Sequence, residues 1–299
     1  MPPRFAVILA GWGLERKAHS PGLGASAILS AMKMALLSLA CCLMLLSTVG
    51  CESARSARIR EMKAIIAASG IDDSAAAALA KRIESAPDRF LYLVDALGVE
   101  MAADPALLRR ADKQKGLPAD FEPSDLVALD GSGLSVSRTG HRLRKSAFEA
   151  LRAMSAAASA DGVTLLVSSA YRSYEYQENL FARNVAEMGE KEAARVSAAP
   201  GTSQHQLGTA MDFGSITDAF ALTAAGKWMA ANAGRFGFSL SFPKGMETVT
   251  GYVWESWHFR YIGKEAVAMQ DEYFDGIQHN LMLFLDALAA KAASAPPNK

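Results

Sequence analysis

Two short segments carry the residues whose types and spacing could do chemistry. The first, SQHQLGTAMD, contains His205 and Asp212, and the second, ESWH, runs from Glu255 to His258. Two histidines and one aspartate can hold a zinc ion, because catalytic zinc sites have three protein ligands and an open position for water. Glu255 precedes His258 by three residues and supplies a carboxylate of the kind that activates such a water for peptide hydrolysis.

Each of these patterns alone is more often ordinary surface chemistry than a metal site. The chain contains few histidines, however, and two of them fall in these segments; the full set is His19, His141, His205, His258 and His279. The joint occurrence of the ligand types and the glutamate therefore favours a metal site over chance.

Three strings in order resemble a known family. They are SSAYRSYEYQ (Ser168–Gln177), PGTSQHQLGTAMDF (Pro200–Phe213) and ESWHFRYIG (Glu255–Gly263). Together they are similar to the VanY-like D-alanyl-D-alanine carboxypeptidases, zinc peptidases of the M15B type, over about half of the chain. One departure is Ser256, where the family often has proline, but this position is a spacer between functional residues.

The resemblance implies a role for each residue of the proposed metal site. His205, Asp212 and His258 are the expected zinc ligands, and Glu255 is the expected general base and then acid. Gly208 would let the backbone turn tightly between the first two ligands. Residues three apart on a flat strand face opposite sides, so Glu255 and His258 require a bend between them to converge.

The resemblance also places other residues near the substrate. Arg172 could stabilise an oxyanion or clamp a substrate carboxylate; its alternative is a structural pair with a loop acid. Ser203 and Gln177 are expected substrate-binding residues, although Ser203 could equally cap a turn. Trp257 is expected in the pocket wall, with core packing as its alternative.

Composition excludes several classes of protein. The chain has 299 residues with 31 basic and 31 acidic side chains, so no basic face for nucleic-acid binding is expected. All three cysteines, Cys41, Cys42 and Cys51, lie near the N-terminus. The remaining chain therefore has no disulfide, no thiolate zinc site and no cysteine nucleophile.

The N-terminal region reads as an export signal. An uncharged apolar run extends from Met34 to Gly50 and is followed by Cys51. This pattern predicts a lipoprotein leader with lipid on Cys51, although Thr48 stands where such sites usually have leucine. A plain signal peptide or an uncleaved anchor are the alternatives. Residues 1–31 precede a second start at Met32 and are either a start-site artefact or a long n-region.

Hydrophobic periodicity and turn residues predict an α+β fold, a small and mainly antiparallel sheet flanked by helices. We expect a leader over 1–51, a helical N-terminal segment over 52–105, a catalytic domain over 106–265, and a C-terminal helix and tail over 266–299. The expected helices are Arg58–Ser69, Ala75–Ser85, Arg89–Leu97, Leu143–Ala158, Tyr174–Met188, Glu190–Ala198, Thr217–Ala233 and Lys264–Leu288. The expected strands are Val163–Val167, Gly208–Phe213, Phe238–Phe242, Thr248–Val253 and Trp257–Ile262.

The function implied by the resemblance is that of a zinc-dependent D,D-carboxypeptidase. Its partners would be peptidoglycan stem peptides, from which it removes the terminal D-alanine in the cell envelope as a monomer. The alternatives are an L,D-carboxypeptidase, a D,D-dipeptidase or an L-Ala-D-Glu endopeptidase with the same catalytic set. A non-catalytic wall-binding lipoprotein is the alternative from a different class.

Overall fold

The computed structural model describes residues 54–294. The chain divides into two compact units, residues 1–57 and 58–299. The helices and strands described below belong to the second unit, apart from helical residues 54–57. Within residues 54–294, no helix combines the length and the apolar character needed to cross a membrane. The predicted leader and Cys51 lie outside the described residues.

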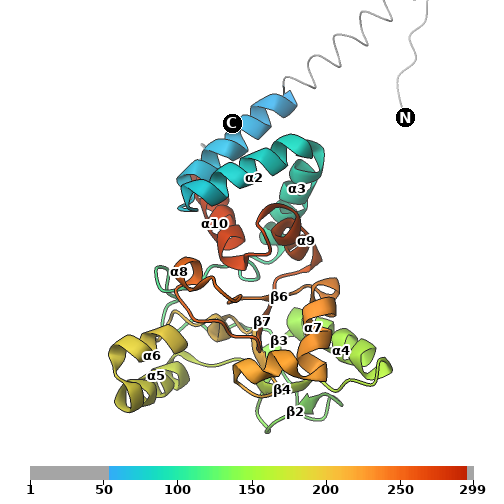
Figure 1. The fold of residues 1–299 in the computed structure, drawn as a ribbon, viewed down its shortest axis with the longest axis vertical. Coiled ribbons are helices and arrows are strands. Elements are labelled where there is room, and N and C mark those ends of the chain that lie inside the picture. Colours follow the sequence, from blue (N-terminus) through green and yellow to red (C-terminus); the bar gives the residue numbers. More distant parts are fainter. Residues whose placement is uncertain (1–53, 295–299) are drawn as a thin grey trace, which may run out of the picture. The chain divides into compact units, whose positions relative to one another are not determined.

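A five-stranded sheet forms the centre of the second unit (Figure 1). Its order is β2-β4-β5-β7-β6, in which β2 and β4 are parallel and the other neighbours are antiparallel. This confirms the predicted small, mainly antiparallel sheet. The strands are β2 (Ser135–Val136), β4 (Leu166–Ser169), β5 (Ala210–Phe213), β6 (Phe238–Leu240) and β7 (His258–Tyr261), and β1 (Leu126–Ala128) pairs separately with β3 (Arg142–Arg144).

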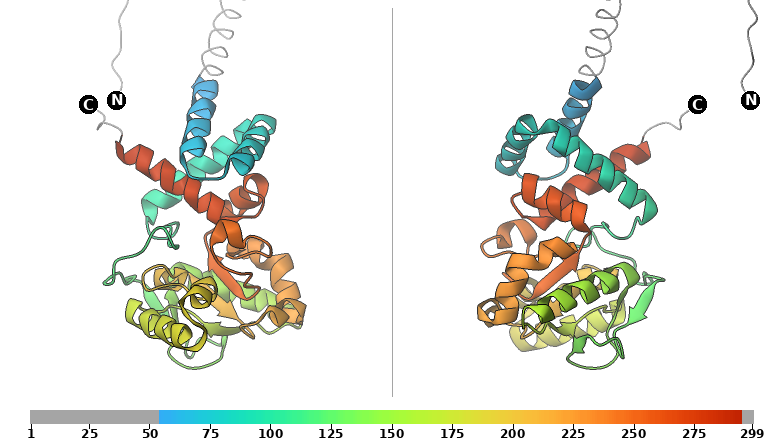
Figure 2. Two further views of the ribbon diagram at one scale, coloured as in Figure 1. Left: turned by 60° about the vertical axis from the view of Figure 1, so that its left-hand side comes forward. Right: turned by 90° about the vertical axis from the view of Figure 1, so that its right-hand side faces the viewer.

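One face of the sheet is covered by α4 (Lys145–Ala160) and α7 (Ala224–Asn232), as Figures 1 and 2 show. Apolar residues recur along α4 at spacings of three and four, so that they all point to the sheet. They join a core that includes Met211, Phe213 and Phe259 from β5 and β7. Successive strand residues point to opposite faces. Asp212, which follows Met211, and His258, which precedes Phe259, therefore point away from this core.

A second core lies among helices from both ends of the unit (Figure 1). It joins α2 (Asp73–Ser85), α3 (Pro87–Ala103), α9 (Lys264–Tyr273) and α10 (Gln278–Ser294) with the helical residues 58–68. We call residues 59–108 and 262–288 the helical cluster. Asp72 caps α2 by accepting from the backbone of Ser74 and Ala75, as expected for an N-cap aspartate. The helical cluster thus joins the predicted N-terminal segment to the predicted C-terminal helix in one core.

A helical hairpin lies beside the other face of the sheet. It consists of α5 (Tyr174–Met188) and α6 (Glu190–Val196). The Ser173 hydroxyl caps the start of α5 by accepting from the Tyr176 amide, and Gly189, with a φ of 81°, separates the two helices. Both helices lie where the sequence predicts them. Further along the chain come the short helical turns η1 (Gln204–Leu207), η2 (Asp218–Leu222), η3 (Ala233–Phe236) and α8 (Glu247–Thr250).

The predicted strand Thr248–Val253 is wrong. The segment instead contains α8, closed by the bond from the Gly251 amide to the Glu247 carbonyl at 2.8 Å. The β-branched residues favour a strand locally, but strand propensity depends on having a neighbour to pair with. The strand β6 pairs with β7 on one side, and this segment does not extend the sheet but lines the pocket through Tyr252.

The largest differences in helix bounds concern α3, the C-terminal helix and the predicted helix Thr217–Ala233. The helix expected to end at Gly98 continues to Ala103, because Gly98 is tolerated in a helix packed through Val94 and Leu97. The predicted C-terminal helix is broken into α9 and α10 by Asp275 and Gly276, which have φ angles of 56° and 70°.

The predicted helix Thr217–Ala233 is divided at Thr223. This residue is extended and caps α7 by accepting from the Gly226 amide. A side chain at Gly226 would lie 2.0 Å from the Phe220 carbonyl oxygen, so the close contact between η2 and α7 depends on this glycine. The sequence shows the apolar residues of both pieces but not the turn between them.

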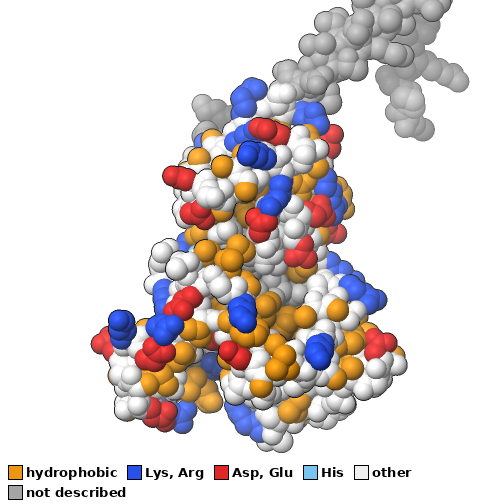
Figure 3. Space-filling model, viewed as in Figure 1, with side chains coloured by type: hydrophobic (Ala, Val, Ile, Leu, Met, Phe, Trp, Pro, Cys, Tyr) orange, Lys and Arg blue, Asp and Glu red, His pale blue; other side chains and the backbone are white. Residues whose placement is uncertain are grey.

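Charged side chains of both signs are interspersed over the face shown in Figure 3. This agrees with the zero formal charge of the chain. A stripe of one sign, which nucleic-acid binding would require, does not appear on that face.

Candidate metal centre

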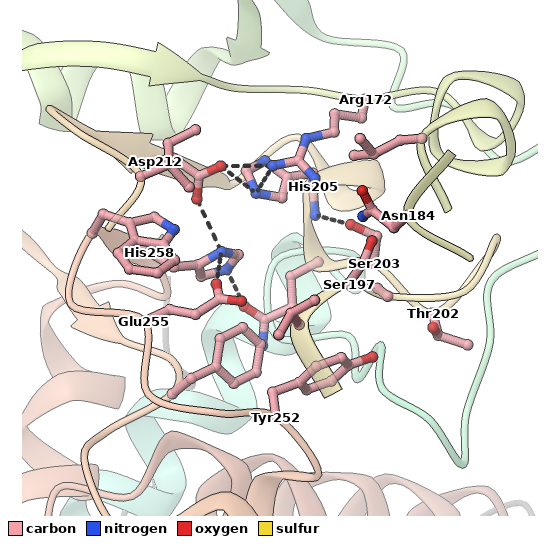
Figure 4. A pocket seen from close by; sticks show the side chains of 17 residues that line it. Arg172, Asn184, Ser197, Thr202, Ser203, His205, Asp212, Tyr252, Glu255 and His258 are labelled. Carbon is pink, nitrogen blue, oxygen red and sulfur yellow. Dashed lines mark hydrogen bonds and ion pairs between the residues drawn. The ribbon is translucent and has the colours of Figure 1, made fainter. Parts of the chain in front are cut away.

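Three elements bring the predicted metal ligands together. His205 lies on η1, Asp212 on β5 and His258 at the start of β7, and their ligand atoms lie within 4.8 Å of one another. Asp212 and His258 are direct partners across the antiparallel strands. The register of β5 and β7 therefore places both side chains on the face of the sheet opposite the α4 core (Figure 4).

Gly208 makes the turn between His205 and Asp212, as predicted. It ends η1 in the left-handed conformation with φ 70°, which only glycine adopts without strain. A Cβ atom there would lie 2.9 Å from Arg144 Cγ and 2.9 Å from Leu126 Cδ2. Conformation and packing thus both require glycine at this position.

The bend predicted between Glu255 and His258 is also present. Ser256 and Trp257 form a turn, and the His258 amide donates to the Glu255 carbonyl at 3.2 Å. The turn brings Glu255 Oε2 to 3.3 Å from His258 Nδ1. The carboxylate therefore lies beside the cluster of ligand atoms, although it is not one of the three.

Hydrogen bonds fix which nitrogen of each histidine faces the cluster. His205 Nδ1 lies 2.7 Å from the Ala170 carbonyl oxygen, and His258 Nε2 lies 3.1 Å from Gln204 Oε1. Both partners accept only, so the contacting nitrogens carry the hydrogens. His205 Nε2 and His258 Nδ1 are left to act as ligands, an arrangement typical of metal-binding histidines.

Asp212 completes a donor set that fits a divalent cation. Its Oδ2 lies 3.3 Å from His205 Nε2, and its Oδ1 lies 3.1 Å from His258 Nδ1. Oδ1 is buried and faces His258 Nδ1, with no hydrogen bond of standard geometry among residues 54–294. A buried carboxylate oxygen that faces an imidazole nitrogen in this way is suited to zinc.

The electrostatics of the cluster reflect burial and close charges. Burial lowers the pKa of His205 to about 4, and the Arg172 cation acts in the same direction. Burial would raise the pKa of Asp212, but His205 and Arg172 outweigh it and hold this pKa well below its ordinary value. Burial also opposes charge on His258, yet the carboxylates of Asp212 and Glu255 raise its pKa to about 9. The charges around Asp212 therefore favour its ionised form, which is the form that binds a metal.

Arg172 follows β4 and contacts the cluster directly. Its Nη2 lies 2.6 Å from Asp212 Oδ2 and 2.9 Å from His205 Nε2. Its Nε donates to Ser169 Oγ at 3.0 Å, and its Nη1 donates to Gln177 Oε1 at 3.2 Å. The guanidinium is therefore held at the edge of the metal site, where either predicted role remains open to it.

The remaining predicted site residues divide between the pocket and its support. Ser203 and Trp257 line the pocket together with the ligands, and the Ser203 hydroxyl also caps η1. Gln177, the other expected substrate-binding residue, is not among the residues that line this pocket. It is buried, with its amide group taken by the Ala198 carbonyl and by Arg172, so it supports the pocket wall. The substrate contacts of all three stay predictions.

The sequence did not point to several polar residues that line the pocket, Asn184 and Tyr252 among them. Asn184 reaches the pocket from α5, and Tyr252 reaches it from the segment after α8 (Figure 4). The Tyr252 hydroxyl is buried, and burial raises the pKa of Tyr252 to about 12. The incorrect prediction of a strand over Thr248–Val253 gave no reason to place Tyr252 at the pocket.

Comparison with known proteins places this site in a family. The model of the VanY family, described as D-alanyl-D-alanine carboxypeptidase, matches residues 140–264. YodJ of Bacillus subtilis, which bears the name of a carboxypeptidase, is 39% identical over 196 residues, which cover 60% of this chain and 72% of YodJ. A D-alanyl-D-alanine carboxypeptidase of Enterococcus faecalis is 39% identical over 119 residues, covering 37% of this chain and 44% of that protein.

Two solved structures have the same architecture. The LD-carboxypeptidase LdcB has a TM-score of 0.54 at 36% identity, covering 60% of this chain and 86% of that chain. A mutant of the vancomycin resistance D,D-pentapeptidase VanY, solved in complex with Zn(II), has a TM-score of 0.50 at 31% identity, covering 60% of this chain and 99% of that chain. The present chain belongs to the VanY carboxypeptidase family, and its metal-ligand cluster lies within the matched residues.

Proposed function

We propose that this protein is a zinc-dependent D,D-carboxypeptidase that removes the terminal D-alanine from peptidoglycan stem peptides. The observation that carries the proposal is the buried cluster of His205, Asp212 and His258, with Glu255 3.3 Å from His258. Family membership supports a peptidase, and the Zn(II) complex of a VanY structure supports zinc as the ion.

The residues of the pocket supply the steps of hydrolysis. His205, Asp212 and His258 would hold the zinc ion, which when bound would lower the pKa of water at the site to about 7 and act as a Lewis acid toward the peptide carbonyl. Glu255 would take one proton from the attacking water and pass it to the leaving amine, so that the peptide gains one water and no proton is lost. Arg172 would stabilise negative charge at the carbonyl oxygen or hold the terminal carboxylate of the peptide.

The choice of a D-Ala-D-Ala end rests on similar proteins. The family description and the Enterococcus faecalis relative both name D-alanyl-D-alanine carboxypeptidase. An L,D-carboxypeptidase is the second candidate, because LdcB has the higher TM-score of the two structures. The two activities use the same catalytic set and differ in the end of the peptide that the pocket accepts.

A non-catalytic wall-binding protein is less well supported. Such a protein would have no need to keep three buried ligand atoms within 4.8 Å and a carboxylate beside them. Burying these polar groups is costly unless a partner compensates them. We also propose that the protein is exported and held in the cell envelope through Cys51.

The decisive experiment combines metal analysis with defined substrates. The purified protein should bind about one zinc per chain and lose hydrolysis on chelation. Mass spectrometry of a stem pentapeptide ending in D-Ala-D-Ala should show loss of one D-alanine, whereas a tetrapeptide should remain intact. Trimming of only the tetrapeptide would establish the L,D activity instead. Full activity in a metal-free preparation would refute the zinc mechanism.

A further inference from the structure

A chain of buried polar contacts connects the metal cluster to the helical cluster. His258 Nε2 contacts Gln204 Oε1 at 3.1 Å, and Gln204 Nε2 donates to Gln278 Oε1 at 3.2 Å. Ser241 Oγ donates to the same Gln204 oxygen at 2.7 Å. Gln278 is the first residue of α10, and both Gln278 and Ser241 are almost fully buried. The five-stranded sheet and the helical cluster are therefore connected by hydrogen bonds that begin at the metal ligand His258.

The orientation of the Gln204 amide decides which nitrogen of His258 can bind a metal. With its oxygen toward His258, it accepts a hydrogen from Nε2 and leaves Nδ1, which faces Asp212, as the nitrogen that can give up its hydrogen and bind a metal. With its NH₂ group toward His258, the hydrogen would be displaced to Nδ1, and the ligand atom would be blocked. The two orientations have nearly the same shape, so packing alone cannot choose between them.

Gln278 makes that choice. It presents an oxygen that only the NH₂ group of Gln204 can bond. Reversing the Gln204 amide would place its NH₂ group against His258 and its oxygen against the Gln278 oxygen. The Ser241 hydroxyl bonds the Gln204 oxygen, but a hydroxyl can donate or accept and so fits either orientation. The glutamine that contacts His258 is therefore oriented by Gln278.

The position of Gln278 depends on the helical cluster. Directly after it, Leu281 and Phe284 of α10 are buried in that core together with Phe90 of α3. A second contact acts on the same strand as His258. Arg260 is fully buried, and its Nη2 donates to the carbonyl oxygens of Leu107 and Arg109 at 2.8 Å each. Most of the helical cluster lies outside the family match of residues 140–264, and none of its residues lines the pocket.

We propose that Gln204 and Gln278 are positioning residues for the metal centre, through which the helical cluster presents His258 Nδ1 as a ligand. Gln278 orients the Gln204 amide, and Gln204 holds the hydrogen on His258 Nε2. This inference rests on the proposed function, because it requires that the site binds zinc. It assigns to the helical cluster a role in the metal site without any contact to substrate.

The test measures zinc affinity of the full chain by competition with a chromophoric chelator, which needs no substrate. Partners that hydrogen-bond a metal ligand typically contribute 10–100-fold to metal affinity. Gln204→Met should therefore weaken zinc binding by roughly 10–100-fold. Gln278→Met should weaken it in the same direction by less, and the double variant should be no weaker than Gln204→Met, since both act through one contact.

A rescue variant and a matched control separate positioning from general stability. In Gln204→Glu both side-chain oxygens accept, so no orientation has to be chosen, and Gln278→Met should then cost no further affinity. Gln270→Met is the control, because Gln270 is a buried glutamine of α9 that bonds Ser239 and the Gly276 carbonyl and makes no hydrogen bond to the metal cluster. It should keep the zinc affinity of the wild type.

Each outcome decides between the proposals. Wild-type affinity in Gln278→Met, an equal loss in Gln270→Met, or a full further loss from Gln278→Met in the Gln204→Glu background would overturn the positioning role. A wild-type protein that binds no zinc would instead overturn the metal in the proposed function. Circular dichroism of every variant identifies unfolding. Zinc affinities of Gln204→Glu with and without Gln278→Met are compared only where both proteins are folded to the same extent.

Discussion

At the scale of single residues, the metal site separates ligands from their neighbours. His205, Asp212 and His258 converge on one point, while Glu255 lies at the edge of that group. The separation follows from the turn at Ser256–Trp257, which brings the Glu255 carboxylate beside the site. The roles proposed for Glu255 and Arg172 therefore lead to different expectations for zinc and for rate.

Glu255→Ala should retain zinc and lose activity. The side chain carries the proton and is not one of the three ligands, so its removal leaves the donor set intact. Activity should fall by about a hundredfold or more, the usual scale for losing a positioned acid–base group. Zinc content by elemental analysis and kcat with a stem pentapeptide are the measurements. Loss of zinc together with activity would make Glu255 a ligand.

Arg172→Lys distinguishes the two roles of the guanidinium. Lysine keeps the charge but loses the planar fork that contacts Asp212, His205 and Gln177. If Arg172 stabilises the transition state, kcat should fall with little change in KM. If it binds the substrate carboxylate, KM should rise instead. Values near those of the wild type for both constants would leave Arg172 a structural role only.

At the scale of elements, short turns decide where the ligands point. η1 and β5 are joined by Gly208, and their arrangement holds His205 opposite Asp212. The backbone of Gly208 also accepts from the Arg144 amide at 2.8 Å. The ligand geometry therefore depends on a close approach between this turn and the β1–β3 ribbon.

Gly208→Ala should destabilise the protein through two effects. The left-handed conformation costs about 1–2 kcal/mol for a residue with a side chain, and overpacking against Arg144 and Leu126 costs about 1–3 kcal/mol more. Urea unfolding gives the free energy of unfolding. Gly131→Ala is the matched control, because Gly131 has a φ of 72° and open space where its Cβ would lie. It should show only the first cost, and equal losses in the two variants would contradict the packing argument.

At the scale of the whole molecule, the five-stranded sheet and the helical cluster belong to one compact unit over residues 58–299. Helices from both ends of this unit share a single core, so the additions to the family core are a continuous structure. Only residues before this unit carry the predicted leader. The proposed site in the cell envelope therefore rests on the sequence around Cys51.

Cys51→Ser should abolish lipid attachment. The predicted leader ends in small residues directly before Cys51, and the lipid would be joined to its sulfur. Several acyl chains anchor a protein stably, whereas one chain does so only marginally. Lipid labelling and detergent-phase partitioning of the wild type and the variant are the measurements. Equal labelling of both proteins would refute the lipoprotein proposal and leave the catalytic proposal intact, since export alone brings an enzyme to the wall.

The sequence by itself determined the family, the α+β class, the candidate ligands and many helix positions. These follow from local signals: motif spacing, periodic apolar residues and the glycine at position 208. Each signal depends on residues close together in the chain, so it can be read without knowing the fold.

Only the tertiary structure decided features that depend on distant partners. Thr248–Val253 has strand propensity but no strand to pair with, and Gln177 turns behind the pocket wall because Ala198 and Arg172 take its amide. The contact between Gln204 and Gln278 joins residues 74 positions apart. Pairing, burial and hydrogen-bond choice at such separations are set by packing, and for that reason the helical cluster could be predicted as helices but not as a support of the metal centre.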